Sequence, residues 1–155
     1  LYPSFLSNDY TLEELDFDAV AQDSDIVFTC LPHGASAETA AQLVSRGLKV
    51  IDLSGDFRYN DVSVYERWYQ IRHAAPELLA ESVYGIPELY RERIKKARLV
   101  GNPGCYTTCA ILAVAPLLNA GVVMPQGIII DAKSGVTGAA AAKSWRIISA
   151  KWTNR

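Results

Sequence analysis

The sequence predicts an α/β fold built on a parallel β-sheet. Residues 25–32, DIVFTCLP, form a continuous apolar run, which is typical of a strand buried on both faces. Residues 33–47 indicate a loop and a helix, and residues 48–56, LKVIDLSGD, indicate a second strand. Strand, helix and strand within about thirty residues make a βαβ unit, whose strands run parallel through a right-handed crossover.

The helix between these strands carries a signal at each end. Ser36 is a residue type that caps helix N-termini. Gly47 is the glycine expected just after a helix C-terminus. We therefore expect Ser36 to cap this helix and Gly47 to close it.

The middle of the chain has a weaker pattern. Between residues 57 and 97, aromatic and charged residues alternate without the period of a strand. Within this stretch, residues 86–97, IPELYRERIKKA, indicate a short exposed helix. Residues 98–103, RLVGNP, then predict a short strand that ends in a turn.

The last predicted elements are an apolar helix and a strand. The helix covers residues 105–120 and is closed by Gly121, with Pro116 as a possible kink. Its apolar part, residues 109–118, is shorter than the ~20 residues of a membrane span, so we expect a buried core helix. Residues 127–135, GIIIDAKSG, predict a fourth strand.

The composition excludes several classes of function. A chain of 155 residues suggests one compact domain or parts of two, with ordinary globular composition. Its net charge of −2 gives no indication of a nucleic-acid partner or an anionic membrane surface. The N-terminus has no signal-peptide pattern. Three cysteines, an odd number, make no disulfide framework, so we expect a reducing cytoplasm.

Cys105 stands where a turn meets the apolar helix. Asn102, Pro103 and Gly104 form the turn, so the helix begins at or just after the cysteine. Unpaired backbone N–H groups and the positive end of the helix dipole favour a thiolate there, which is the nucleophilic form of cysteine. The alternative is a small residue that fills space at a helix start.

The other two cysteines indicate packing. Cys109 lies one turn further along the same helix and Cys30 lies in an apolar strand, so we expect both in the core. A zinc site requires four ligands at recognised spacings, which His33 and His73 do not supply. The sequence therefore predicts no metal site.

Polar residues follow the first two strands. Ligands of open α/β sheets bind at the carboxyl ends of the strands, where His33 follows the first one. His33 is therefore a candidate cofactor contact, with an ordinary solvated loop histidine as the alternative. Arg58 follows the second strand and could bind phosphate or carboxylate in a forked geometry. The alternative for Arg58 is a local pairing with Asp56.

A glycine-containing stretch follows the last predicted strand. Residues 134–140, SGVTGAA, resemble part of a phosphate-binding loop. The signal is weak, because the G-x-G-x-x-G spacing is absent.

Five blocks of the chain together resemble one enzyme family. They are LPHG (31–34), KVIDLSGDFR (49–58), VYGIPEL (83–89), NPGCYTT (102–108) and DAKSGVTGA (131–139). In order and spacing they resemble N-acetyl-gamma-glutamyl-phosphate reductase, an arginine-biosynthesis enzyme related to aspartate-semialdehyde dehydrogenase. The resemblance runs from about Leu1 to Ala139 and implies a Rossmann-like sheet and NADP as cofactor.

The resemblance also implies a reaction and the residues for it. In this family the cysteine of the NPGCY block, here Cys105, attacks N-acetyl-glutamyl 5-phosphate; phosphate leaves and a thioester forms. NADPH then delivers a hydride and the semialdehyde is released. By analogy with the wider superfamily, Arg58 would bind the leaving phosphate. The implied cofactor contacts are Pro32, His33 and Gly34 on the nicotinamide side, together with Ser134 and Gly135.

The chain departs from the family at both ends. The family opens with a strand and a Gly-rich dinucleotide loop, which are missing before Leu1, and uses a later histidine as general acid/base. We therefore expect residues 1–104 to be a partial NADP-binding domain and residues 105–155 the start of a catalytic domain. These residues alone are expected to be inactive, and the full-length enzyme is expected to be a homo-oligomer. The alternatives are an amino-adipyl phosphate reductase of lysine biosynthesis and an inactive truncated fragment.

Overall fold

The computed structural model describes residues 13–133. The chain divides into two compact units, Leu1–Thr108 and Cys109–Arg155. The first unit contains a four-stranded sheet in which every strand pair is parallel. The predicted α/β fold with a parallel sheet is confirmed.

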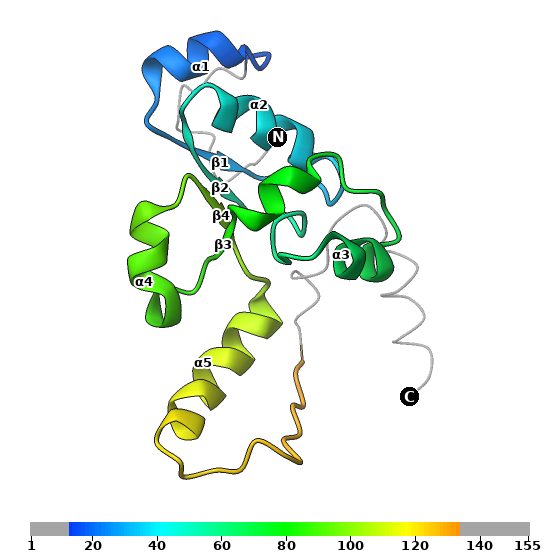
Figure 1. Ribbon diagram of the computed structural model, residues 1–155, viewed down its shortest axis with the longest axis vertical. Helices are drawn as coiled ribbons and strands as arrows, with labels where there is room; N and C mark the ends of the chain where they lie inside the picture. Colours follow the sequence, from blue (N-terminus) through cyan, green and yellow to red (C-terminus); the bar gives the residue numbers. More distant parts are fainter. Residues whose placement is uncertain (1–12, 134–155) are drawn as a thin grey trace, which may run out of the picture. The chain divides into compact units, whose positions relative to one another are not determined.

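The strands follow one another in the order β1-β2-β4-β3 (Figure 1). Their bounds are β1 Ile26–Thr29, β2 Lys49–Asp52, β3 Val83–Tyr84 and β4 Leu99–Gly101. Thr29 pairs with Asp52, which in turn pairs with Gly101, so β1, β2 and β4 end at one level. Because these strands are parallel, the loops that follow them leave from the same edge of the sheet.

Strand β1 is more exposed than its apolar sequence predicts. The side chains of Ile26 and Phe28 are 49% and 63% exposed. Among the described residues β1 pairs with β2 alone and lies at the end of the strand order. A strand in that place lacks the second neighbour whose side chains would cover it, so the expected burial on both faces is wrong.

Six helical segments accompany the strands within residues 13–133. They are α1 Phe17–Asp23, α2 Ser36–Ser45, α3 Val62–Tyr69, the 3-10 helix η2 Pro76–Ala80, α4 Pro87–Lys96 and α5 Cys105–Asn119. Helix α4 has no buried residue, which confirms the exposed helix predicted there.

Three helical segments, α1, α3 and η2, and the strand β3 were not predicted. Helices α1 and α3 begin at the caps Asp16 and Asp61, whose carboxylates accept backbone N–H groups of the first turn. Each helix has only about two turns, which is too short to show a clear hydrophobic period. Strand β3 has two residues and is defined by its pairing with β4, a contact that local sequence does not encode.

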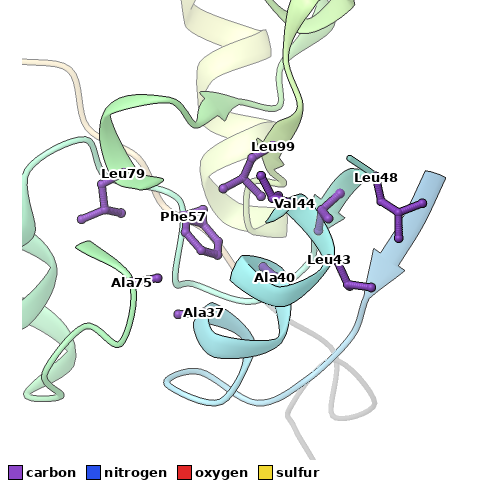
Figure 2. Packing of buried hydrophobic residues seen from close by; sticks show 10 residues of the cluster. Ala37, Ala40, Leu43, Val44, Leu48, Phe57, Ala75, Leu79 and Leu99 are labelled. Carbon is purple, nitrogen blue, oxygen red and sulfur yellow. The ribbon is translucent and has the colours of Figure 1, made fainter. Parts of the chain in front are cut away.

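The hydrophobic core lies where α2 packs on β1 and β2 (Figure 2). Its buried side chains come from α2, from the strands and from the segment that follows β2. They are Ala37, Ala40, Leu43, Val44, Leu48, Val50, Phe57, Ala75, Leu79 and Leu99. Burying one leucine or phenylalanine side chain stabilises the fold by ~1.5–3 kcal/mol, so this cluster holds α2 on the sheet.

The C-terminus of α2 ends as predicted. Gly47 has a φ of +88°, and its N–H donates to the carbonyl of Val44. The N–H of Leu48 donates to the carbonyl of Leu43. Together these bonds form a Schellman motif, which satisfies carbonyls that the helix leaves unpaired. The closure of the helix at Gly47 is confirmed.

The N-terminus of α2 differs from the prediction. Ser36 is the first residue of the helix, and its hydroxyl donates to the carboxylate of Asp52. The backbone N–H groups of Ser36 and Ala37 donate to the carboxylate of Asp56, at 3.1 and 3.0 Å. A charged acceptor binds a helix N-terminus more strongly than a hydroxyl does. The prediction of Ser36 as the cap is therefore wrong.

The helix α5 begins at Cys105 as predicted and ends one residue earlier than predicted, at Asn119, but it does not have the predicted burial. Gly121, with a φ of +66°, donates its N–H to the carbonyl of Leu118 and closes the helix, and Pro116 lies inside it. No residue of α5 is buried, so the expected core helix over residues 109–118 is wrong. Burial depends on side chains from other elements, which an apolar run in the local sequence does not supply.

The predicted fourth strand is also absent from the described residues. Residues 127–133 form no strand, and the side chain of Ile129 is 92% exposed. A strand exists only when another backbone segment pairs with it, and no described residue pairs with this stretch.

Replacing Gly47 tests the closure of α2. We expect Gly47→Ala to destabilise the protein by about 1–2 kcal/mol, because a side chain is strained in the left-handed region. No atom lies within 4 Å of the added β-carbon, so backbone strain alone is measured. Urea unfolding should show a lower midpoint with an unchanged m-value. Gly47→Asn is the control and should cost less; an alanine variant as stable as wild type would contradict the motif.

Candidate active site

Three loops leave the carboxyl edge of the sheet after β1, β2 and β4. The loop after β2, residues 53–58, contacts both of the others. The backbone hydrogen bonds between neighbouring strands continue one residue beyond the strand ends. The N–H of Leu53 donates to the carbonyl of Thr29, and the N–H of Asn102 donates to the carbonyl of Asp52. The structure thus connects the segments that carry His33, Arg58 and Cys105.

Cys105 is the first residue of α5, and it is exposed. The carbonyl of Gly104 accepts the N–H of Thr108 and the hydroxyls of Thr107 and Thr108, each at 2.9 Å. These bonds form the first helical turn directly after the glycine. Cys105 therefore occupies the predicted helix start, and its exposure argues against a residue that merely fills space.

Cys30 and Cys109 are exposed as well. The prediction that both lie in the core is wrong. Cys30 follows an edge strand, and Cys109 belongs to a helix without buried residues. Exposure alone therefore does not distinguish Cys105 from the other two cysteines, whereas its place at a helix start does.

Arg58 extends from the β2 loop to the turn before Cys105. Its Nε donates to the carbonyl of Asn102 at 2.9 Å, and its Nη2 donates to the carbonyl of Leu53 at 3.2 Å. A β-carbon placed on Gly104 would lie 3.4 Å from Nη1, which has no hydrogen-bond partner among the described residues. Arg58 does not pair with Asp56, so the predicted alternative of a local ion pair is wrong, and Nη1 lies beside the glycine that precedes Cys105.

Gly101 allows this close approach. A β-carbon at Gly101 would overlap the carbonyl of Phe57, the residue before Arg58. Only glycine lets the end of β4 touch the backbone of the β2 loop. This contact sets the distance between the start of the Arg58 side chain and the turn that leads to Cys105.

The carboxylate of Asp56 is fully buried and joins two loops. Its Oδ1 accepts the N–H of Gly34 at 2.8 Å and the hydroxyl of Tyr65 at 2.9 Å. Its Oδ2 accepts the N–H groups of Ser36 and Ala37. No cation pairs with Asp56 among the described residues, so backbone dipoles at the start of α2 compensate its charge.

His33 is anchored by one ring nitrogen. Its Nδ1 accepts the N–H of Gly55 at 2.7 Å, so the proton of the neutral ring is on Nε2. The ring centroid lies 5.2 Å from that of Tyr69. His33 is exposed, but these contacts orient it more than an ordinary solvated loop histidine.

Three supporting residues were missed by the sequence analysis: Tyr65, Tyr69 and His73. Nε2 of the buried His73 donates to the carbonyl of Asp56 at 2.8 Å, and its Nδ1 accepts the N–H of Ala75. All three come from the stretch 57–97, where the density of aromatic residues was the one available signal.

Burial raises the pKa of the Tyr65 phenol, and its hydrogen bond to the Asp56 carboxylate raises that pKa further. The phenol therefore remains a hydrogen-bond donor to Asp56 well above neutral pH. This bond orients Oδ1 of Asp56, the same oxygen that accepts the N–H of Gly34.

Other predicted features are not part of this geometry. Ser134 and Gly135 lie outside the described residues. Within residues 13–133, no three His, Cys, Asp or Glu side chains gather as a metal site would require. No helix in the same range is long and apolar enough to cross a bilayer.

Comparison with known families identifies the fold around this site. Residues 4–97 match the family model described as the semialdehyde dehydrogenase NAD binding domain. The chain belongs to the semialdehyde dehydrogenase family. Residues 105–153 match the semialdehyde dehydrogenase dimerisation domain. The family model indicates a nicotinamide cofactor.

Curated relatives carry a more specific name. The chain is 52% identical over 141 residues to the N-acetyl-gamma-glutamyl-phosphate reductase of Acetivibrio thermocellus, covering 90% of this chain and 40% of the relative. It is 61% identical over 115 residues to the enzyme of that name from Symbiobacterium thermophilum, covering 74% and 33%. The chain thus spans between a third and two fifths of the length of these relatives. The resemblance predicted from the five blocks is confirmed.

Replacing Tyr65 tests the buried carboxylate network at high pH. Because the pKa of Tyr65 is raised in the folded protein, the unfolded chain loses this proton first as the pH exceeds 10.0. The stability from this group is complete below that pH and decreases above it, by up to about 1.4 kcal/mol per pH unit.

We therefore expect urea unfolding between pH 8 and pH 11 to show a shallower alkaline loss of stability for Tyr65→Phe than for wild type. Tyr90→Phe is the control, because Tyr90 lies on the exposed helix α4. Equal alkaline slopes for Tyr65→Phe and wild type would contradict the buried phenol.

Proposed function

We propose that the protein containing this chain reduces N-acetyl-L-glutamyl 5-phosphate to N-acetyl-L-glutamate 5-semialdehyde, with NADPH, in arginine biosynthesis. The observation that carries the proposal is the exposed Cys105 at the start of α5, with Nη1 of Arg58 beside the preceding glycine. The names of the relatives favour this acyl phosphate over amino-adipyl phosphate.

In the first step the sulfur of Cys105 attacks the acyl carbon as a thiolate. A C–S bond forms, the bond from the acyl carbon to the phosphate oxygen breaks, and phosphate leaves with that electron pair. Arg58 is held by Asn102 and Leu53, so its remaining N–H groups receive the departing phosphate without reorganisation. The product of this step is a thioester on Cys105.

In the second step the thioester carbon is reduced and the C–S bond breaks. The hydride for this reduction would come from NADPH when it is bound. The electron pair of the broken bond returns to Cys105, whose place at the positive end of α5 suits a thiolate leaving group. The same helix start therefore serves the attack and the release.

The turn Pro32, His33 and Gly34 fits the nicotinamide side of the cofactor. Two of the first N–H groups of α2, those of Ser36 and Ala37, are already bound to Asp56, so this helix start offers fewer donors to a cofactor phosphate. Leu31 and Leu53, each about two fifths exposed, add apolar surface for a ring. Ser134 and Gly135 are proposed as further cofactor contacts. The choice of NADP over NAD rests on the family resemblance.

The organisation of the protein is also part of the proposal. Residues 1–104 would belong to the cofactor domain and residues 105–155 to the start of the catalytic domain. The match to a dimerisation domain supports a homo-oligomer. The three free cysteines support a reducing cytoplasm as its location.

Replacing the cysteines separately tests the nucleophile. In the full-length protein, Cys105→Ser is expected to reduce kcat by about 10³-fold or more, because a hydroxyl is a far weaker nucleophile than a thiolate. NADPH binding should change little. Cys30→Ser and Cys109→Ser are matched controls, since both residues are exposed and neither starts a helix. Substantial activity in Cys105→Ser would reject the proposed mechanism.

Replacing Arg58 tests the phosphate contact. Arg58→Ala is expected to weaken inorganic phosphate as a substrate of the reverse reaction by about tenfold or more, which is 1.4 kcal/mol or more. Arg58→Lys should recover only part of this, because an ammonium group cannot hold Asn102, Leu53 and an anion in a fork. Arg91→Ala, on the exposed face of α4, is the control. An unchanged phosphate KM in Arg58→Ala would remove Arg58 from the site.

A further inference from the structure

Two buried carboxylates lie at the carboxyl edge of the sheet, and they have different hydrogen-bond partners. Asp52 and Asp56 are both 0% exposed. Asp52 accepts the hydroxyls of Thr29, Ser36 and Ser54, which are all structural neighbours. Asp56 accepts the N–H of Gly34, a residue of the turn that the proposed function places beside the nicotinamide.

The backbone of Asp56 is held as firmly as its side chain. Its N–H donates to the hydroxyl of Ser54 at 3.0 Å, and its carbonyl accepts Nε2 of His73 at 2.8 Å. Two residues further on, Arg58 extends to the turn before Cys105. Asp56 is therefore a fixed point between the Gly34 turn and the guanidinium of Arg58.

The Gly34 turn has few other restraints. Gly34 has a φ of +84°, a conformation that most residues avoid. The N–H of Ala35 donates to the carbonyl of Pro32, which closes the turn on itself. Its links to the β2 loop are the bond from Gly34 to Asp56 and the bond from Gly55 to Nδ1 of His33.

We propose that Asp56 is a positioning residue, which sets the turn Pro32–Gly34 against Arg58 through its bond to the N–H of Gly34. This inference rests on the proposed function and adds a residue that contacts neither substrate nor cofactor. In Asp56→Asn the amide has one oxygen and one NH₂ group, so it cannot accept from the four donors that the carboxylate satisfies. The Gly34 turn is then no longer held in place by its bond to residue 56, while the volume of the side chain at position 56 is conserved.

The experiment compares Asp56→Asn with Asp52→Asn in the full-length protein. Both variants remove one buried charge and are expected to lower the melting temperature. We expect Asp56→Asn to raise the dissociation constant of NADPH about tenfold, measured by the fluorescence of the bound nucleotide. Asp52→Asn should change it less than twofold. If wild type binds NADH more tightly than NADPH, NADH is the probe.

The outcomes separate positioning from mere stability. Equal effects of the two variants on nucleotide affinity, or no effect of Asp56→Asn, would overturn the proposal. Where Asp56→Asn does not fold, Tyr65→Phe replaces it, because this change removes one donor from Oδ1 and keeps the charge. It should raise the dissociation constant at least twofold, and an unchanged affinity would overturn the proposal.

Nucleotide binding also separates this inference from the proposed function. A wild-type protein that binds nucleotide but does not reduce N-acetylglutamyl phosphate would reject the substrate, and the two Asn variants would still decide the role of Asp56. A wild-type protein that binds neither NADPH nor NADH would overturn both.

Discussion

The buried carboxylate of Asp56 at the N-terminus of α2 is the interaction on which the rest of the site depends. Removing a carboxylate from water costs several kcal/mol, so an unpaired charge in this place must be balanced by donors. Two helical N–H groups, the N–H of Gly34 and the phenol of Tyr65 supply that balance. The carboxylate of Asp56, in the loop after β2, therefore links this loop by hydrogen bonds to α2 and to the loop after β1.

Close backbone approach is the second constraint. The parallel strands end at one level, but side chains would still keep the loops apart. Gly101 lets the end of β4 touch the carbonyl of Phe57, and Gly104 leaves room for the guanidinium of Arg58. Two missing β-carbons thus let the guanidinium of Arg58 reach the turn that precedes Cys105.

The N-termini of α2 and α5, which both lie at the carboxyl edge of the sheet, differ in the groups they offer to a ligand. Helix N-termini commonly bind phosphate, yet the start of α2 is occupied by the protein's own carboxylate. The start of α5 bears a cysteine and has an arginine beside it. The proposed function accordingly places the leaving phosphate beside Cys105 and the uncharged nicotinamide ring at the Gly34 turn.

The sequence by itself determined the parallel α/β fold, the closure of α2 at Gly47 and the helix start at Cys105. Each of these follows from neighbouring residues: an apolar run, a glycine that tolerates positive φ, or a turn before a helix. The five sequence blocks also identified the family. Tertiary structure decided the cap of α2, because Asp56 is twenty residues from Ser36 and competed successfully with its hydroxyl.

Tertiary structure also decided the exposure of β1 and α5 and the absence of a strand at residues 127–133, since burial and pairing depend on a second element. Tyr65 and His73 entered the site through contacts that no local pattern encodes. Hydrophobic period and turn chemistry are local properties and can be read from the chain. Which donor reaches a buried charge is a property of the folded molecule alone.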